Sequence, residues 1–330
     1  MTNFKIGIQL TKNKEKYEYL LSVLNSNLNS KKGLEFIHIA DDDDIKTKIG
    51  ELDILTTYAI SEDIFINASG KLKWIHFGLA GIENNLFTSI LKSKTIITNA
   101  SGVHADSVSE FTMGMMLYLS KQFVGCEKFK NDADWTQWEL ARKTIQLKGR
   151  TIGIIGFGQI GKAIAKMAKA FDMKVIATRR LQKKVETKNI VDKLIPLSDL
   201  DYLLSESDYV VIACPLTPLT KGMMGKNELA KMKSSAFIIN IARGVIIDET
   251  ALIQALQSRK IAGAGLDVFS TEPLDKDSPL FDLDNVFLSP HISGNFSEYQ
   301  RNVILQFADN LNRYMAGKEL KNRVCKKRLY

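Results

Sequence analysis

The stretch 151–161, Thr-Ile-Gly-Ile-Ile-Gly-Phe-Gly-Gln-Ile-Gly, constrains the fold of this 330-residue chain more than any other. An apolar run suited to a buried strand leads directly into Gly156, Gly158 and Gly161, and a helical pattern follows through Phe171. This order is the dinucleotide-binding fingerprint: the first glycine makes the tight turn, the second lets a pyrophosphate approach the backbone, and the third lets helix and strand pack closely. The helix then offers unpaired N–H groups and a positive dipole end to the phosphates.

The glycine spacing alone is weak evidence, because three glycines at these intervals also arise by chance in a chain that contains 21 of them. An incidental glycine turn is the alternative. The context favours a cofactor turn, since a second apolar strand at Lys174–Thr178 completes a strand–helix–strand unit. The residues expected to hold a dinucleotide at this turn are Gly156, Gly158, Gln159, Ile160 and Gly161.

Strand-like and helix-like segments alternate along most of the chain, which is typical of parallel α/β sheets. Before residue 101 the strand candidates are Lys5–Leu10, Leu34–Ile39, Leu52–Thr56, Trp74–Phe77 and Thr95–Thr98. From Thr151 on they are 151–155, 174–178, 208–213, 236–240, 261–266 and 286–288. Helical spacing marks Glu15–Asn25, His104–Phe123, Glu228–Met232, Glu249–Gln257 and Ser297–Met315.

The sequence therefore predicts an α/β protein with two doubly wound parallel-sheet domains. Residues 101–295 are expected to form a Rossmann domain that binds NAD(P), and residues 1–100 with 296–330 a smaller, flavodoxin-like substrate domain. A substrate is expected in the cleft between the two.

Composition narrows the class of protein. Apolar and charged fractions of 45% and 25% are those of an ordinary soluble globular protein, and no uninterrupted apolar run is long enough to span a bilayer. Lys and Arg are dispersed despite a net charge of +8, so we expect neither a nucleic-acid nor a membrane partner. Three widely spread cysteines and a start without a signal peptide predict a cytoplasmic protein. The acidic run Asp41–Asp44 is interpreted as a loop or helix start, and no metal site is expected.

Three polar side chains lie on loops that directly follow predicted strands of the second domain. Arg243 follows 236–240, Glu272 follows 261–266 and His291 follows 286–288. Open α/β sheets bind ligands beyond the carboxyl ends of their strands, so we expect these groups to converge near the nicotinamide end of a dinucleotide.

The segments around these residues resemble the D-2-hydroxyacid dehydrogenase family. The signature pieces are Asn240-Ile241-Ala242-Arg243-Gly244, Leu266-Asp267-Val268-Phe269 followed by Glu272-Pro273, and Ser289-Pro290-His291-Ile292. The upstream segments Cys214-Pro215-Leu216-Thr217-Pro218 and Gly153–Gly158 fit as well. The resemblance is sharp from about Trp74 to the closing helix and loose before it.

The resemblance implies a role for each of the three residues. Arg243 would bind the substrate carboxylate and 2-oxo group, a task that suits a planar fork of donors. His291 would be the general acid in reduction and the general base in oxidation, and Glu272 would orient its imidazole. The alternatives are a surface ion-pair arginine, a loop-ending glutamate and a structural histidine.

The resemblance also implies further contacts. The backbone N–H groups of a loop containing Leu79, Ala80 and Gly81 would meet the substrate carboxylate, with a plain turn as the alternative. Residues expected to touch the cofactor are Cys214, Pro215, Ile241, Ala242 and, at the nicotinamide, Asp267. The other histidines, His38, His76 and His104, are given no proton-transfer role.

The end of the second Rossmann strand predicts the cofactor. An acid that holds the ribose 2′-hydroxyl of NAD is expected there, but the strand ends Ala177-Thr178-Arg179-Arg180 and no acid follows before Glu186. Two guanidiniums and the Thr178 hydroxyl suit a 2′-phosphate, as in the NADP-using relatives. We expect NADP, with NAD possible and a merely solvated basic turn as the alternative.

The combined prediction is NADPH-dependent reduction of a small 2-oxo acid to the D-2-hydroxy acid. The resemblance further implies a homodimer built through the long helix near residues 104–123. One rival is an NAD-dependent phosphoglycerate-type dehydrogenase, against which the basic pair argues. A formate dehydrogenase is disfavoured because that relative pairs its histidine with glutamine where Glu272 stands. A rival from another class is a dinucleotide-sensing regulatory protein without catalysis.

Overall fold

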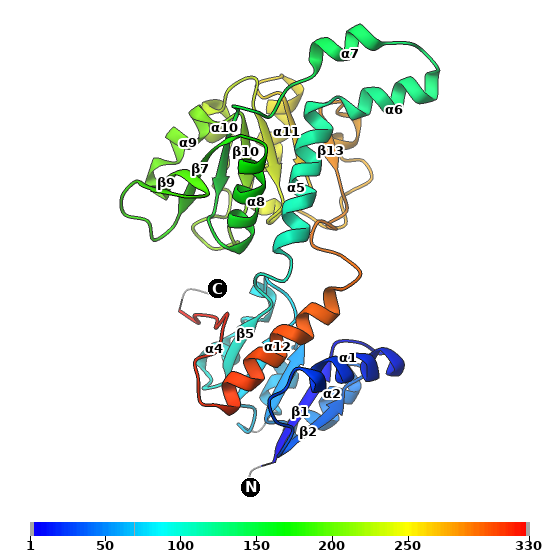
Figure 1. Ribbon diagram of the computed structural model, residues 1–330, viewed down its shortest axis with the longest axis vertical. Coiled ribbons are helices and arrows are strands. Elements are labelled where there is room, and N and C mark those ends of the chain that lie inside the picture. The colour runs from blue at the N-terminus through cyan, green and yellow to red at the C-terminus, as the bar shows by residue number, and fades with distance from the viewer. Residues whose placement is uncertain (1–2, 69, 328–330) are drawn as a thin grey trace. The chain divides into compact units, whose positions relative to one another are not determined.

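A computed structural model describes residues 3–68 and 70–327 of the chain. It divides the chain into two compact units (Figure 1). One unit holds the residues up to His104 together with those from Phe296 onward, and the other holds Ala105–Asn295. The chain passes from the first unit to the second at 104/105 and returns to the first unit at 295/296.

The first unit is built on a five-stranded parallel sheet in the order β2-β1-β3-β4-β5, the order of flavodoxin-like folds. Its strands are β1 (Phe4–Gln9), β2 (Leu34–His38), β3 (Ile54–Thr57), β4 (Trp74–Phe77) and β5 (Ile96–Asn99). The central strands β3 and β4 are buried on both faces, and they bury the polar residues Thr56, Thr57 and His76 together with their apolar ones.

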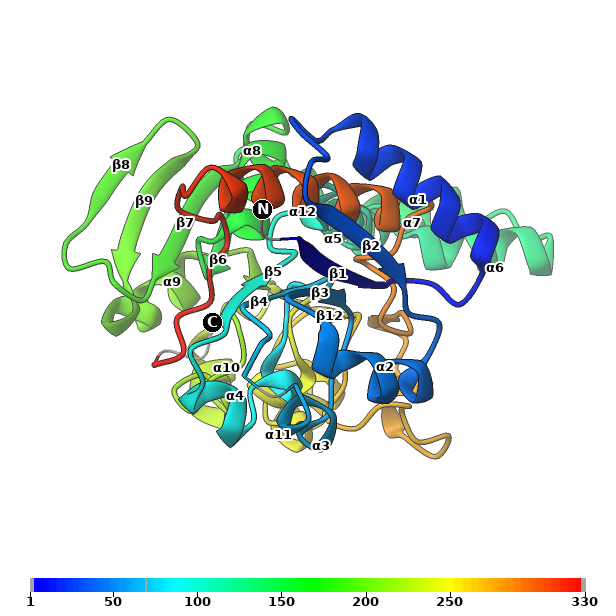
Figure 2. The same cartoon turned by 90° about the horizontal axis from the view of Figure 1, so that it is seen from below.

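Helices cover both faces of this sheet (Figure 2). On one face lie α1 (Lys14–Ser26) and α12 (Tyr299–Met315), which pack against each other. On the other face lie α2 (Asp42–Lys48), α3 (Glu62–Ile66) and α4 (Thr88–Lys92). The acidic run begins α2: the Asp41 side chain caps the helix by accepting from the Asp44 N–H at 3.0 Å, which confirms the helix-start interpretation.

The second unit carries an eight-stranded sheet in the order β13-β12-β11-β10-β6-β7-β9-β8. Its strands are β6 (Thr151–Ile155), β7 (Lys174–Arg179), β8 (Glu186–Lys188), β9 (Val191–Pro196), β10 (Tyr209–Ile212), β11 (Phe237–Asn240), β12 (Gly263–Leu266) and β13 (Val286–Leu288). The run β9-β7-β6-β10-β11-β12 has the Rossmann order 3-2-1-4-5-6, which confirms the predicted fold class. Every pairing is parallel except that of β8 with β9.

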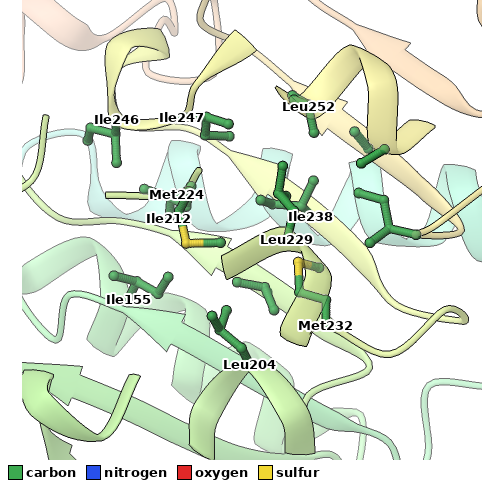
Figure 3. Close-up of a cluster of buried hydrophobic side chains, with 14 of the residues drawn as sticks. Ile155, Leu204, Ile212, Met224, Leu229, Met232, Ile238, Ile246, Ile247 and Leu252 are labelled. Carbon is green, nitrogen blue, oxygen red and sulfur yellow. The ribbon is translucent and has the colours of Figure 1, made fainter. Parts of the chain in front are cut away.

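Helices also cover both faces of the second sheet. α5 (Ala105–Ser120) and α8 (Gln159–Ala170) pack on one face. α9 (Leu200–Glu206), α10 (Lys226–Lys231) and α11 (Glu249–Gln257) pack on the other, over a fully apolar core that Figure 3 shows around Ile212, Leu229 and Ile238.

This unit differs from the sequence prediction in the two strands of a hairpin and in three helices. The hairpin β8–β9 was missed, so β9 supplies the third Rossmann strand and the predicted 286–288 strand is an added edge. The predicted helix His104–Phe123 ends at Ser120, where Gln122 takes a left-handed φ of 58°. Two further helices then follow, α6 (Phe123–Asp132) and α7 (Gln137–Lys143). In the described part of the chain, no helix combines the length and apolarity needed to cross a membrane.

Candidate active site

The glycine turn joins β6 to α8 at the carboxyl edge of the second sheet. Gly156 has a φ of 106°, and a Cβ on it would lie 2.7 Å from the Cys214 backbone nitrogen. A Cβ on Gly161 would lie 2.1 Å from the Gly156 carbonyl oxygen, so this glycine permits the close approach of helix and strand. A Cβ on Gly158, in contrast, would meet nothing within 4 Å. The space over Gly158 and the N-terminal residues Gln159 and Ile160 fits a bound pyrophosphate.

The end of β7 carries the predicted cofactor-selecting residues. Thr178 is buried, whereas Arg179 and Arg180 are exposed. The first acid downstream, Glu186, lies in β8, where hydrogen bonds from Gln182 and Lys188 hold its pKa below the usual value. Residues 179–185, which follow the buried part of β7, thus include two arginines and no Asp or Glu.

The segment after β10 lies against the glycine turn. Burial raises the pKa of the Cys214 thiol to about 11, which keeps it a neutral packing group. The carbonyl of the next residue, Pro215, accepts from Thr220 Oγ1 at 2.8 Å. This hydrogen bond fixes the segment beside the proposed pyrophosphate position.

The loop that carries Arg243 is braced by Asn240, the last residue of β11. The Asn240 side chain accepts from the Ala242 N–H at 3.1 Å and donates to the Arg243 carbonyl at 3.0 Å. Ile241 and Ala242 are buried, and the Arg243 guanidinium donates to the Ala242 carbonyl at 2.7 Å. No role was predicted for Asn240; a polar residue that ends a buried strand is the signal for such a brace.

Glu272 and His291 form a direct pair. His291 Nδ1 lies 2.7 Å from Glu272 Oε2, and Glu272 Oε1 accepts from the Phe269 N–H at 3.0 Å. Both side chains are about half exposed. Because a carboxylate accepts hydrogen bonds, this contact assigns the ring hydrogen to Nδ1 and leaves Nε2 outside the pair.

The Arg243 loop touches the Glu272 loop through the backbone. A Cβ on Gly244 would lie 1.8 Å from the Phe269 carbonyl carbon, so the two loops are in van der Waals contact. The structure thus pairs Glu272 and His291 directly and packs the backbone after Arg243 against the backbone of the Glu272 loop. A pocket of about 630 Å³ opens beside the pair, with mainly apolar walls that include Leu274, Phe281 and Leu288.

Asp267 lies beneath the His291 loop. Its carboxylate is fully buried and accepts from Ser289 Oγ at 2.6 Å and from the N–H groups of Ile292 and Ser293 at 2.9 and 3.0 Å. His291 itself has a left-handed φ of 53°, a conformation that is costly for a residue other than glycine. Asp267 is therefore an anchor of the His291 loop, a contact that the sequence did not predict.

In the first unit, Leu79, Ala80 and Gly81 follow β4 at the carboxyl edge of the sheet. Their preceding residue, Gly78, is buried, and a Cβ on it would lie 2.9 Å from Tyr58 Cε1 and 3.2 Å from Leu10 Cδ2. Leu10 and Tyr58 also line a pocket of about 550 Å³ over the ends of β1, β2 and β3. Two histidines of this unit are structural: His38 Nε2 donates to the Thr11 carbonyl at 2.8 Å, and His76 is fully buried.

The described residues contain no group of three or more His, Cys, Asp or Glu side chains that could hold a metal ion. The three cysteines are all unpaired.

Comparisons with known proteins agree with this geometry. Residues 113–293 match the NAD-binding domain of the D-isomer specific 2-hydroxyacid dehydrogenases. The glyoxylate reductase of Thermococcus litoralis is 36% identical over 84% of this chain and 85% of its own length. The D-3-phosphoglycerate dehydrogenase of Archaeoglobus fulgidus is 33% identical over 78% of this chain but only 48% of its own length.

Among solved structures, the NADPH-dependent glyoxylate/hydroxypyruvate reductase of Sinorhizobium meliloti, in complex with NADP and sulfate, shares the fold. Its TM-score is 0.84 at 24% identity, with 99% of this chain and 100% of that chain covered. The matched domain, the glyoxylate reductase relative and the shared fold establish that this chain belongs to the D-2-hydroxyacid dehydrogenase family and is an NAD(P)-dependent oxidoreductase.

Proposed function

We propose that the protein reduces a small 2-oxo acid to the D-2-hydroxy acid with NADPH. The observation that carries the proposal is the Glu272–His291 pair at 2.7 Å, with the Arg243 loop packed against the Glu272 loop. The glyoxylate reductase relative supports the reaction class. A bound nicotinamide supplies the hydride; the residues of the chain bind the acid, orient it and transfer the proton.

His291 is the proposed proton donor. Its Nε2 gives a proton to the substrate oxygen as the carbonyl carbon gains the hydride, so a C=O bond becomes a C–OH group. The imidazolium that precedes this transfer is stabilised by the Glu272 carboxylate at Nδ1. In the direction of oxidation the same nitrogen removes the hydroxyl proton.

Arg243 is the proposed binding group for the 2-oxo acid. A guanidinium offers parallel N–H donors to a carboxylate oxygen and the neighbouring carbonyl oxygen at once. Its backbone is fixed by Asn240, so little entropy remains to be lost on binding. The N–H groups of Leu79, Ala80 and Gly81 are the proposed second site for the substrate carboxylate.

NADP is the proposed cofactor of choice. β7 ends with the buried Thr178 and the exposed Arg179, and the exposed Arg180 follows it. A carboxylate at this place would repel a 2′-phosphate, whereas guanidiniums bind one. The cofactor contacts proposed for Cys214, Pro215, Ile241, Ala242 and Asp267 all lie on loops at the carboxyl edge of the same sheet.

The protein is further proposed to act as a cytoplasmic homodimer. α6 and α7 have no buried residue and extend away from the second sheet (Figure 1), with Trp135 and Trp138 exposed by 74% and 70%. Large exposed aromatic groups on such a segment are typical of an interface, which would continue the predicted contact through α5. Sedimentation of a Trp135→Ser/Trp138→Ser double variant should show monomer; an unchanged dimer would place the interface elsewhere. The unpaired cysteines suit a reducing compartment.

A panel of 2-oxo acids assayed with NADPH and NADH tests the proposed reaction. We expect the wild type to reduce at least one small 2-oxo acid and the variant His291→Gln to lose this activity. Tight NADPH binding without turnover of any acid would instead favour the sensor. Turnover only with NADH would favour a phosphoglycerate-type or other NAD-linked dehydrogenase.

A further inference from the structure

The Gly78–Gly81 segment is held by its carbonyl groups. The Gly78 carbonyl accepts from the Tyr299 hydroxyl, the Leu79 carbonyl from the Ala100 N–H at 2.9 Å, and the Ala80 carbonyl from Asn99 Nδ2 at 2.7 Å. Three consecutive carbonyls are thus fixed by three donors, two from the end of β5 and one from the start of α12.

Most N–H groups of the same segment have no acceptor in the described part of the protein. The Gly78 N–H donates to the Thr57 carbonyl at 2.8 Å, but those of Leu79, Ala80 and Gly81 have no protein acceptor within the described ranges. These three residues are partly exposed. Successive N–H groups that the protein leaves without an acceptor are available to an anion.

Of the three donors that hold these carbonyls, Tyr299 is the farthest from the segment in sequence, and it alone donates from a hydroxyl. Its ring stacks between other rings of the first unit, 4.6 Å from His104 and 6.4 Å from Tyr58 between ring centroids. Burial raises the pKa of the Tyr299 phenol, so the hydroxyl stays protonated and remains a donor. The neighbouring Gln300 donates to the Leu10 carbonyl at 2.6 Å, which fastens the first turn of α12 to the end of β1 as well.

We propose that Tyr299 is a positioning residue for substrate: its hydroxyl holds the Gly78 carbonyl and so directs the N–H groups of residues 79–81 toward the substrate carboxylate. This inference rests on the proposed function and adds to it a residue outside the signature motifs. Tyr299 belongs to the first unit, whereas the cofactor turn and the Glu272–His291 pair belong to the second. Its proposed effect is therefore on acid binding and not on proton transfer.

The variant Tyr299→Phe isolates the hydroxyl, because phenylalanine keeps the stacked ring. A lost neutral hydrogen bond corresponds to about 1 kcal/mol, so KM for the 2-oxo acid should rise about five- to tenfold. kcat and the Kd of NADPH should stay within about twofold, and the pH profile of reduction should not move. The variant loses only binding energy that the substrate and the transition state share. Tyr314→Phe is the matched control: it lies on the same helix but stacks on Trp74 at 5.5 Å, away from the loop, and should change none of these.

Two readouts separate this inference from the proposed function. Oxamate, a 2-oxo acid analogue that is not reduced, should bind the NADPH-loaded wild type and lose affinity in Tyr299→Phe. Hydrogen exchange of the amides of residues 79–82 should speed up in the same variant and not in Tyr314→Phe. Exchange that speeds up without loss of 2-oxo acid or oxamate affinity would overturn the positioning role, as would failure of the wild type to bind oxamate.

If the wild type binds oxamate but reduces no 2-oxo acid, the proposed reaction fails while the positioning role is still decided by oxamate affinity. A fall in kcat with unchanged KM would also contradict the inference, because it would assign Tyr299 to the chemical step.

Discussion

At the residue scale, the end of β7 makes cofactor choice testable. In an Arg179→Ala/Arg180→Ala double variant, the preference for NADPH over NADH should fall by at least about 100-fold, since each of two charge-assisted hydrogen bonds to a phosphate contributes about 1.5–3 kcal/mol. The ratio of kcat/KM for the two cofactors measures this. Lys183→Ala/Lys184→Ala, two exposed lysines on the following turn, is the control. An unchanged ratio in the arginine variant would reject the NADP assignment.

Asp267 gives a second prediction at this scale. In Asp267→Asn one carboxylate oxygen becomes an NH₂ group that faces a backbone N–H, so the loop that holds His291 at its φ of 53° loses part of its anchor. We expect kcat for the 2-oxo acid to fall 10- to 100-fold while the melting temperature drops by only a few degrees.

Ser289→Ala, which removes one donor to Asp267 and leaves both backbone donors, should reduce kcat far less. Equal losses in the two variants would mean that loop anchoring is not what Asp267 contributes.

The pairing of Glu272 with His291 could be anticipated because both follow parallel strands, and the carboxyl ends of such strands share one edge. The anchoring of the His291 loop by Asp267 could not. It depends on backbone N–H groups that every residue carries, so no sequence pattern marks them. The role of Tyr299 could not be predicted for a related reason. Its acceptor is the backbone carbonyl of Gly78, which lies 221 residues away in the sequence and is like the carbonyl of any other residue.

At the scale of elements, the glycine turn makes two neighbouring substitutions differ. A Cβ at position 161 would press on the Gly156 carbonyl at 2.1 Å, so Gly161→Ala should destabilise the second unit by about 1–3 kcal/mol and weaken NADPH binding. A Cβ at position 158 meets nothing, so Gly158→Ala should keep stability and lose NADPH affinity alone. Urea unfolding and NADPH titration measure both. Full NADPH affinity in Gly158→Ala would mean that no phosphate lies there.

Elements with an apolar face were predicted well, as α11 at Glu249–Gln257 and β6 at Thr151–Ile155 show. Elements without one were missed. α6 buries none of its residues, so it has no apolar stripe at helical spacing. β8 has only three polar residues, and β9 is interrupted by charges and ends in proline, which is typical of an edge and not of a core strand.

At the scale of the whole molecule, His76 limits stability in acid. It lies in β4 and is fully buried, with Nδ1 2.9 Å from Thr98 Oγ1, and burial lowers its pKa to about 3. In the unfolded chain a histidine titrates near 6.5. Between these values the unfolded chain binds a proton that the folded chain does not, so stability must decrease as the pH falls.

The predicted loss is about 1.4 kcal/mol per pH unit from about pH 6.5 down to about pH 3, or about 5 kcal/mol in total. The variant His76→Gln lacks this titrating group. Its unfolding free energy should therefore fall less steeply over that pH range, by about 1.4 kcal/mol per pH unit, whatever the stability of the variant at pH 7. Urea unfolding at several pH values measures the slope. A Trp135→Phe/Trp138→Phe background leaves the buried Trp74, two residues from His76, as the sole tryptophan reporter of the first unit. Equal slopes for His76 and His76→Gln proteins would show that acid unfolding of this unit is governed by its carboxylates instead.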